Sequence, residues 1–538
     1  MDIRAVKPRV RPGPAFMSSS TAARARHYPL TPQVGDVVAG VSVASVLVPQ
    51  ALAYAELAGL PPIHGLYAAT LPPIAAALAA SSPYLQTGPV ALTSLLTFGA
   101  LTVIAPVESE RYVALAALLA LCVGVARAVF GLARLGWVAY LMSQPVVRGF
   151  TGASALLIIA SQLPSALGAA APAGGLLSRA AWAVWHPAGW EPAAVVLTLL
   201  TLALVLFGHR VHALFPSVLV AVVLGIAYSA AAGYSGPVVG PVRTGLPFVG
   251  GPLPWGSLPG LVLPGLVIAL VGFAEPAAIA RTYAMQDRRR WSPDREFVSQ
   301  GLANLAAGLS AGFPVGGSFS RTSINRLAGG RTRWSGAVTG LVVLAFLPFA
   351  WVLAPLPRAV LGAIVIGAVV KLVAVRGLLK LWQVSVPQAA IGWTTFGLTL
   401  ALAPRVDQAI IVGIGLAGVV HIWRELQVGV RTSYDQGVLT LEPQGVLFFG
   451  SAPGLEETLV NQVAEHPDAV RVVLDLEELG RIDFTGAMAL KSVVQETVDA
   501  GLEMEVRHVP PHAARILSRV FGPEGLSGLT GLPFGPDG

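Results

Sequence analysis

The sequence predicts an α-helical polytopic membrane protein with fourteen membrane-spanning segments, followed by a small α/β domain. Of the 538 residues, 54% are hydrophobic and only 12% are charged, and the mean hydropathy is +0.69. A soluble domain carries about 25% charged residues, so most of this chain must face lipid. The single cysteine, Cys122, excludes a disulfide framework and a cysteine-based zinc site.

Charge divides the chain into two parts of different character. The net charge is +7, yet residues 1–433 hold 29 Lys and Arg against 12 Asp and Glu, whereas residues 434–538 hold 6 against 16. We therefore expect a cytoplasmic N-terminal segment at 1–33, a transmembrane domain at 34–424, a linker at 425–433 and a soluble domain at 434–538. The N-terminal segment is polar and Arg-rich and lacks the apolar core of a cleavable signal peptide.

Each expected span is an apolar run of about 20 residues or somewhat fewer, separated from the next by Gly, Pro or charged residues. The runs are 36–56, 63–80, 88–104, 112–131, 137–161, 191–208, 215–233, 259–279, 296–311, 317–328, 335–354, 358–374, 387–403 and 406–423. With the N-terminus inside, most Lys and Arg fall on the inner side, Arg127 and Arg134 among them, and few on the outer side, Arg358 among them. This bias supports fourteen spans with both termini in the cytoplasm. A count of twelve spans would also place both termini there.

Two of these segments, 88–104 and 317–328, are short. Each begins within a stretch that has a Gly/Pro-rich lead-in followed by a helix start, Ser82–Leu96 and Gly312–Asn325. If the spans form two halves of seven, each is the third of its half, which predicts a transporter binding site. A helix that begins in mid-membrane presents free N–H groups and its positive dipole end, so two such ends form an anion site without a metal. We expect Thr87 to cap the first helix, with Pro89 just inside it, and Ser318 or Ser320 to cap the second. The alternative is a pair of ordinary broken helices in a structural bundle.

Two acidic residues lie inside apolar runs, where a charge costs about 2.5–3.5 kcal/mol or more. Glu275, near the end of the eighth span, is a candidate for holding a cation or a transported proton, and its alternative role is to pair with Arg281 or Arg321. Glu56 lies closer to a Gly/Pro loop, where a coupling role and a structural role both remain open.

Three further polar residues extend this candidate site. Arg321 lies in the first turns of the second short helix, where its charge would favour an anion; its alternative role is to pair with Glu275. Gln50 and Tyr54 are spaced by four residues on the first span and share one helix face, although Tyr54 could equally serve packing.

At these residues the sequence resembles the sulfate permease family, also called SulP or solute carrier family 26. The resemblance is carried, in chain order, by VPQALAYAELAGLPPIHGLYAA (Val48–Ala69), TGPVALTS (Thr87–Ser94), FAEPAAIAR (Phe273–Arg281) and GGSFSRTSIN (Gly316–Asn325). It implies two inverted repeats of seven spans, a core domain with the site between two half-helices, and a gate domain that supports a homodimer. Transport is then expected by an elevator-like movement of the core.

The resemblance also carries the family's site positions onto this chain. The implied substrate-binding residues are Gln50, Tyr54, Gly88, Pro89, Val90, Ala91, Gly317, Ser318, Phe319, Ser320 and Arg321. Glu275 matches the acidic position tied to ion coupling in microbial members, and Glu56 remains a second candidate. One turn after Glu275 stands Ile279, not a hydroxyl residue, which favours protons over sodium as the coupling ion.

The tail after Ser433 alternates strands with helices, which predicts a small α/β domain. We expect a strand hairpin over 437–450 that turns at Pro443-Gln444-Gly445, a helix over 454–466, a strand–turn–helix unit over 470–501, and a last strand and helix over 502–522. DLEELGRIDFTGAMAL (Asp475–Leu490) resembles the core motif of STAS domains, which end the transporters of this family. Thr485 matches a serine that is phosphorylated in stand-alone STAS regulators, but a helix N-cap is the simpler expectation.

These features together predict a secondary active anion transporter of the inner membrane, coupled to protons, which carries sulfate, bicarbonate or a C4-dicarboxylate. The expected partners are the anion, a proton, the bilayer and a second copy of the chain, with no cofactor, metal or nucleic acid. The alternatives are an uncoupled exchanger or channel and a nucleobase permease of the same architecture. An enzyme is not expected, because the sequence lacks HExxH, GxSxG and phosphate-loop motifs and its nine His have no metal spacing.

Overall fold

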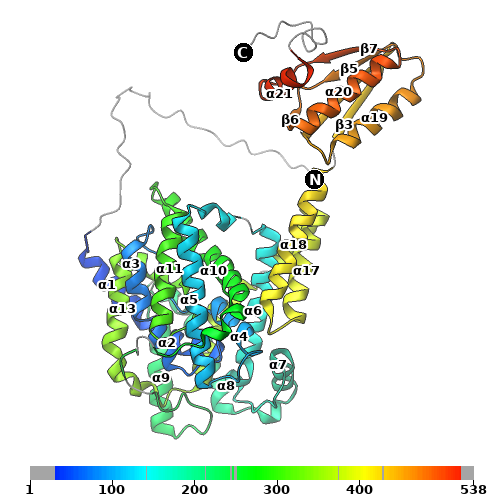
Figure 1. Ribbon diagram of the computed structural model, residues 1–538. Helices are drawn as coiled ribbons and strands as arrows, with labels where there is room; N and C mark the ends of the chain where they lie inside the picture. The colour runs from blue at the N-terminus through cyan, green and yellow to red at the C-terminus, as the bar shows by residue number, and fades with distance from the viewer. Residues whose placement is uncertain are drawn as a thin grey trace. The chain divides into compact units, whose positions relative to one another are not determined.

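The computed structural model describes residues 31–140, 142–212, 214–242, 245–247, 251–373, 375–426 and 429–522. The chain divides into two compact units, one built from Met1–Lys380 and Gly392–Ile411 and the other from Leu381–Ile391 and Val412–Gly538. In Figure 1 the helices from α1 to α18 run from blue to yellow, and a small α/β domain follows in orange and red. The expected N-terminal segment 1–33 and the end of the tail lie largely outside the described residues.

Every apolar run that the sequence predicts overlaps at least one helix of the structure. The helices of the first half are α1 (Val34–Leu57), α2 (Ile63–Ala68), α3 (Leu71–Ala79), α4 (Ala91–Leu101), α5 (Glu110–Leu132), α6 (Gln144–Leu167), α7 (Leu176–Trp185), α8 (Pro192–Phe207) and α9 (Ser217–Ala232). Those of the second half are α10 (Leu258–Gln286), α11 (Pro293–Leu309), α12 (Phe319–Leu327), α13 (Trp334–Phe346), α14 (Arg358–Val369), α15 (Val375–Leu379), α16 (Leu381–Val384), α17 (Val386–Ala401) and α18 (Val406–Glu425). Short 3-10 turns are η1 (Gly136–Tyr140), η2 (Pro187–Gly189), η3 (Gly208–Arg210), η4 (Trp255–Ser257), η5 (Leu347–Leu353) and η6 (Val370–Leu372). Among the described residues, eight helices are long and apolar enough to cross a bilayer, judged by length and composition.

The structure differs from the predicted spans in three places. The run 63–80 is not one helix but α2 and α3, which meet at Thr70; prolines at Pro72 and Pro73 suit a new helix start, because proline lacks the N–H that an interior turn needs. Helix α7 is not predicted, since it is short and falls between the apolar runs. Helix α10 continues through Pro276 to Gln286, so Glu275 lies several turns before its end and not near it.

The two halves interlock around a short pair of strands. Strand β1 (Thr87–Gly88) pairs antiparallel with β2 (Gly316–Gly317), with Thr87 opposite Gly317 and Gly88 opposite Gly316. These strands lead directly into the two short helices, α4 and α12. Helix α1 packs against α12, and α10 packs against α4, so the first helix of each half contacts the short helix of the other half. Each contact has an equivalent when the two halves are interchanged, as an inverted repeat predicts.

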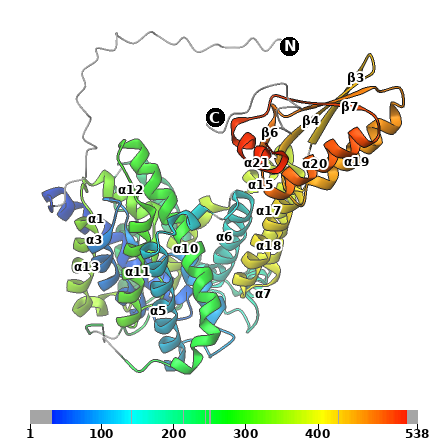
Figure 2. The ribbon, with the colours of Figure 1, turned by 45° about the horizontal axis from the view of Figure 1, so that its top comes forward.

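Small residues allow the helices behind these strands to approach closely. Helix α11 packs along α5 and α3, and the three helices are labelled in Figure 2. A Cβ added to Gly301 of α11 would lie 2.7 Å from the backbone nitrogen of Ala128, and one added to Gly308 would lie 2.6 Å from the carbonyl oxygen of Ala117. Close packing at small residues is the usual way in which membrane helices associate.

The C-terminal domain is a mixed sheet covered by helices. Its strands are β3 (Gly429–Asp435), β4 (Val438–Leu447), β5 (Arg471–Asp475), β6 (Leu479–Ile482) and β7 (Glu503–Arg507), and its helices are α19 (Ala452–Glu465), α20 (Phe484–Asp499) and α21 (Pro511–Phe521). The strand order is β3-β4-β5-β7, with β6 beside β4. Only β3 and β4 are antiparallel; the other pairs are parallel.

The expected hairpin turn at Pro443-Gln444-Gly445 is wrong. Strand β4 runs through these residues, and the turn lies at Gln436 and Gly437, between β3 and β4. Both turn residues have positive φ, +46° and +81°, which is the backbone of a tight two-residue hairpin turn. The strand β3 before this turn was not predicted.

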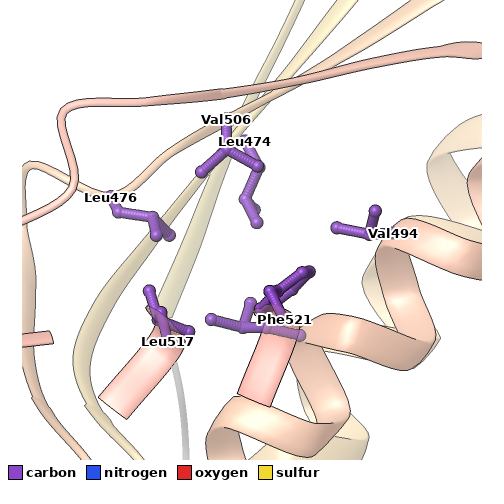
Figure 3. A pocket seen from close by; sticks show the side chains of 7 residues that line it. Leu474, Leu476, Val494, Val506, Leu517 and Phe521 are labelled. Atoms are coloured by element: carbon purple, nitrogen blue, oxygen red, sulfur yellow. The ribbon is translucent and has the colours of Figure 1, made fainter. Parts of the chain in front are cut away.

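The domain has its own apolar core. Seven side chains line a small pocket in it (Figure 3): Leu474, Leu476, Leu490, Val494, Val506, Leu517 and Phe521. All seven are apolar, so the pocket offers no side-chain polar group that would orient a ligand.

Candidate functional site

The site forms where the β1–β2 pair brings the N-termini of α4 and α12 together. The Ser318 N–H donates to the Gln86 carbonyl oxygen at 3.1 Å and extends the strand pair by one bond. Helix α11 holds β1 and the residue that precedes β2: the Gln300 side-chain amide donates to Thr87 Oγ1 at 2.8 Å, and the Asn304 amide bonds both the N–H and the carbonyl oxygen of Val315. Extended backbone at this depth is therefore held by polar partners inside the protein.

Neither short helix is capped by the side chain of its own N-cap residue. Helix α4 begins at Ala91 with Val90 as the N-cap, so the expected Thr87 cap and the expected place of Pro89 inside the helix are wrong. The physical reason is that Thr87 is a residue of β1, three positions before the N-cap, where its hydroxyl accepts from Gln300. Ser318 does occupy the N-cap position of α12, but its hydroxyl lies 3.2 Å from Ser320 Oγ and caps no N–H group.

Arg321 joins the two halves from inside this junction. Its side chain is fully buried, and Nη1 donates to the Pro89 carbonyl oxygen at 2.8 Å and to Gln50 Oε1 at 3.4 Å. Nε and Nη2 have no hydrogen-bond partner in the described structure. A buried guanidinium with two free donors is costly unless an acceptor binds there.

Gly88 allows this approach. Its φ of +155° lies in a region that residues with a Cβ rarely adopt, and an added Cβ would lie 3.5 Å from Arg321 Nη2. Glycine at this position therefore keeps the space beside the free donors open.

Glu275 contacts the start of α12 directly. Its Oε1 accepts a hydrogen bond from the backbone N–H of Phe319 at 3.3 Å, and its carboxylate interacts electrostatically with Arg321. The acid on α10 thus takes the place that an N-cap side chain would take. Ile279, one turn later, is buried against Leu85 and Tyr283 and offers no oxygen for a cation.

The structure brings most of the predicted site residues together and leaves two apart. Gln50 and Tyr54 are buried on α1, and Tyr54 interacts electrostatically with Arg321 and Glu275. Phe319 is 55% exposed, with its ring stacked near that of Tyr283. The assembled residues are Gln50, Tyr54, Gly88, Pro89, Val90, Ala91, Glu275, Gly317, Ser318, Phe319, Ser320 and Arg321.

Glu56 has a different partner. Its carboxylate lies 3.4 Å from Arg358 Nε, in an ion pair at the C-terminal end of α1. This contact supports the structural alternative for Glu56 and accounts for Arg358, which begins α14.

Thr485 does not cap its helix. The N-cap of α20 is Asp483, whose carboxylate accepts from the Gly486 N–H at 2.7 Å, and Thr485 is exposed in the first turn. Aspartate is among the strongest N-cap residues, so it takes this place two residues earlier.

Sequence reasoning missed the role of Arg127, which is expected only on the inner side of the membrane. It is fully buried in α5 and donates to the carbonyl oxygens of Ala269 at 3.1 Å, Ile268 at 3.1 Å and Val315 at 2.9 Å. The available signal was an arginine several residues inside the apolar run 112–131.

Comparison with known proteins identifies the family of the chain. The profile of the sulfate permease family matches residues 34–394, and that of the STAS domain matches residues 430–520. The chain belongs to the sulfate permease family. "Probable sulfate transporter Rv1739c" of Mycobacterium tuberculosis is 31% identical over 504 residues, covering 88% of this chain and 89% of that one. "Probable sulfate transporter 4.2" of Arabidopsis thaliana is 30% identical over 525 residues, covering 90% of this chain and 77% of that one.

Solved structures show the same fold. The murine Slc26a9 anion transporter in the inward-facing state superposes with a TM-score of 0.81 at 20% identity, over 90% of this chain and 87% of that one. The transmembrane domain of the cyanobacterial bicarbonate transporter BicA superposes with a TM-score of 0.60 at 26% identity, over 71% of this chain and 96% of that one. The chain is therefore a multi-pass membrane transporter of the sulfate permease family with a C-terminal STAS domain, and its relatives are transporters, not enzymes.

Proposed function

We propose that this transporter is a proton-coupled symporter of a small anion, with sulfate as the first candidate. The observation that carries the proposal is the buried Arg321, with Nε and Nη2 unpartnered, beside two helix N-termini that meet across the β1–β2 pair. The printed names of its relatives from M. tuberculosis and A. thaliana support sulfate, and the likeness to BicA supports bicarbonate as the second candidate.

The anion would bind between the starts of α4 and α12. Backbone N–H groups at Ala91 and beyond, and at Phe319 and beyond, would donate to its oxygens, and the free guanidinium donors of Arg321 would complete the shell. Gln50, Tyr54 and Ser320 would line the same space. Because every donor is a protein group, this mode of binding needs no cofactor or metal.

Coupling would follow from competition at the Phe319 N–H. An ionised Glu275 already accepts from this group, so it holds the position that an anion oxygen would use. A proton on Glu275 would remove its negative charge and weaken that hold, so proton and anion would bind together. This is the thermodynamic reciprocity that symport requires.

Movement and topology complete the proposal. Helices α1, α3, α5 and α10–α13 pack mainly on one another, as do α6, α8 and α14, which is the division that a core moving against a gate would use. We further propose that both termini are cytoplasmic, on the basis of the positive-inside bias. The homodimer in the inner membrane is proposed from the family resemblance. The domain boundaries of the sequence analysis are kept in this proposal, except that the STAS domain begins with β3 at Gly429 and not at residue 434.

Reconstitution in liposomes tests the function. Uptake of labelled sulfate, bicarbonate, fumarate and uracil is measured with and without an inward proton gradient. Faster uptake of one anion under the gradient supports symport and names the substrate. Downhill flux that ignores the gradient would refute symport and leave an exchanger or channel, and uptake of uracil alone would overturn the anion site.

A further inference from the structure

Arg127 is a buried cation that lies directly behind the proposed anion site. In the described part of the chain, three charged side chains hydrogen-bond to residues 86–90 or 315–319: Arg127, Arg321 and Glu275. Arg127 donates to the carbonyl oxygen of Val315, the residue just before β2. Its Nη2 lies 2.6 Å from where a Cβ on Gly272 would be, so a side chain at that position would displace the guanidinium, and Gly272 is one helical turn before Glu275.

The partners of Arg127 are backbone carbonyl oxygens, and none of them carries a full negative charge. Its three hydrogen bonds go to Ile268, Ala269 and Val315, and no ion pair of Arg127 occurs among the described residues. A guanidinium stays protonated in proteins, so this site carries a permanent positive charge. Burying an uncompensated charge is expensive, and an anion bound nearby would offset that cost.

Charge counting then separates monovalent from divalent substrates. With Glu275 protonated, Arg321 alone would balance a monovalent anion, whereas Arg321 and Arg127 together balance a divalent one. We infer that Arg127 is a specificity-determining residue that sets the transporter's preference for divalent over monovalent anions. This inference rests on the proposed function, because it assigns the charge class of the anion at the same site.

The size of the effect can be estimated from distance. Val315 is three residues from Ser318, which is about 10 Å of extended chain. A unit charge about 10 Å away at an effective dielectric constant of about 20 changes the affinity by about tenfold for each unit of anion charge. Removal of the charge should therefore change the ratio of sulfate to monovalent-anion affinity by about tenfold.

The experiment compares Arg127→Gln with Arg127→Lys in full-length protein in liposomes. Competition by sulfate, selenate, chloride and nitrate against labelled-sulfate uptake gives an apparent affinity for each anion. We expect Arg127→Gln to reduce the sulfate-to-nitrate affinity ratio about tenfold, and Arg127→Lys, which keeps the charge, to stay near the wild-type ratio. A role in folding alone would lower the amount of active protein in both variants without changing the ratio.

The results distinguish a failure of the role proposed for Arg127 from a failure of the proposed transport function. An unchanged ratio in a folded Arg127→Gln protein that still transports sulfate would overturn the role of Arg127 and leave the proposed function intact. If neither variant folds, the wild-type series decides, because nitrate or chloride competing as well as sulfate would also overturn it. No transport or binding of any anion by the wild type would instead refute the proposed function.

Discussion

The carboxylate of Glu275 accepts a hydrogen bond from the backbone N–H of Phe319, the first residue of α12, at 3.3 Å. The acid comes from the first helix of the second half and the N–H from its short third helix. An acidic side chain therefore occupies the end of a helix at which an anion would be stabilised. In our proposal the proton-binding group and the anion would use this same position, which gives the coupling proposal a defined atom to test.

Glu275→Gln should uncouple transport from the proton gradient. Glutamine keeps an oxygen that can accept from the Phe319 N–H, but it cannot bind or release a proton. We expect stimulation of uptake by an inward proton gradient to fall by at least about tenfold, which corresponds to about 1.4 kcal/mol, while exchange of anion for anion persists. The measurement is labelled-anion uptake in liposomes with and without the gradient.

Glu56→Gln is the matched control for this variant. It removes the other acid within an apolar run, whose partner is Arg358 at 3.4 Å and not a half-helix. The two side chains are partly exposed, but Glu56 Oε1 and Arg358 Nε are themselves buried, so the variant should lower the melting temperature and leave gradient stimulation unchanged. Loss of stimulation in Glu56→Gln and not in Glu275→Gln would reverse our assignment of the two acids.

Arg321→Gln should weaken anion binding. The substitution removes a charge and the two donor atoms, Nε and Nη2, that are buried without a hydrogen-bond partner in the described structure. A hydrogen bond to a charged group contributes about 1.5–3 kcal/mol, so the apparent affinity should fall about 10-fold to 100-fold. Arg321→Lys restores the charge but not the planar fork, and it should recover only part of the affinity. An affinity within twofold of wild type in both variants would remove Arg321 from the site.

Gly88→Ala should impair the same site through the backbone. The position has φ of +155°, and an added Cβ would stand 3.5 Å from Arg321 Nη2. We expect a cost of about 1–3 kcal/mol, seen as a lower melting temperature of the detergent-solubilised protein together with weaker anion binding. Gly260→Ala is the control, because an added Cβ there meets no atom within 4 Å and alanine favours the surrounding helix α10. Equal melting temperatures for the two variants would contradict the argument.

The helical part was largely predictable because its main signal is local. Apolar runs and their Gly/Pro breaks identify a span without knowledge of what it packs against, and the positions of α4 and α12 follow from the interrupted runs around Gly88 and Gly317. The caps were not predictable in the same way. The Thr87 hydroxyl was assigned to the nearest helix start, but its partner is Gln300, more than 200 residues away.

Arg127 and Arg321 also show how far sequence reasoning depends on local signals: it located Arg321 in its helix but missed the role of Arg127. Both are arginines next to apolar sequence, and Arg321 was placed correctly because it follows the Gly/Pro-rich stretch of a short helix. The sequence places Arg127 only on the inner side of the membrane, because its carbonyl partners on α10 and before β2 become available only when distant segments meet. In the tail, local preference at Pro443-Gln444-Gly445 was overridden by pairing of β4 with β3.

Asp483→Ala should destabilise the STAS domain, and Thr485→Ala should not. Asp483 caps α20 through its bond to the Gly486 N–H, whereas Thr485 is exposed in the first turn. We expect a loss of about 1 kcal/mol, within about 0.5–2 kcal/mol, for the first variant and a change within about 0.5 kcal/mol for the second. Urea unfolding of residues 425–538 measures both. A larger loss for Thr485→Ala would restore threonine as the cap.

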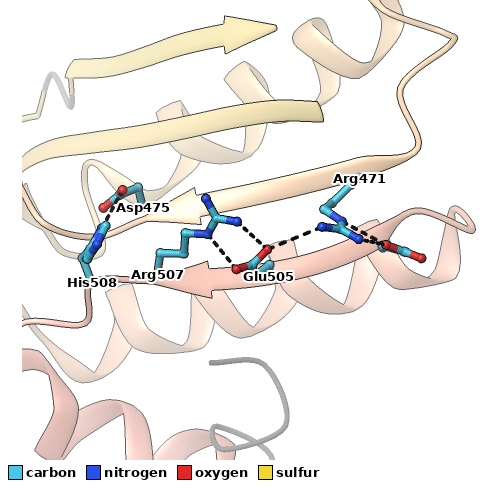
Figure 4. Close-up of polar contacts among 6 residues, drawn as sticks. Arg471, Asp475, Glu505, Arg507 and His508 are labelled. Atoms are coloured by element: carbon cyan, nitrogen blue, oxygen red, sulfur yellow. Dashed lines mark hydrogen bonds and ion pairs between the residues drawn. The ribbon is translucent and has the colours of Figure 1, made fainter. Parts of the chain in front are cut away.

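Protonation of His508 should stabilise the STAS domain at mildly acidic pH. His508 Nδ1 lies 2.8 Å from Asp475 Oδ2, at the ends of β7 and β5 (Figure 4). The hydrogen bond to the Asp475 carboxylate, and its charge, raise the pKa of His508 above the ordinary value of about 6.5. The folded state therefore binds this proton more tightly than the unfolded state does, and the stabilisation is fully present below about pH 6.5 and is lost as the pH rises through the folded pKa.

Asp475→Asn provides the test, because asparagine keeps a hydrogen-bonding oxygen but not the charge. An NMR titration of the imidazole in residues 425–538 should give a lower midpoint for His508 in the variant than in the wild type. The difference in unfolding free energy between the two proteins should be larger at about pH 5.5 than at about pH 8.5, because only the protonated imidazole gains from the carboxylate. Equal His508 midpoints would show that Asp475 does not hold the proton, and a stability difference that grows with pH would contradict the sign of the linkage.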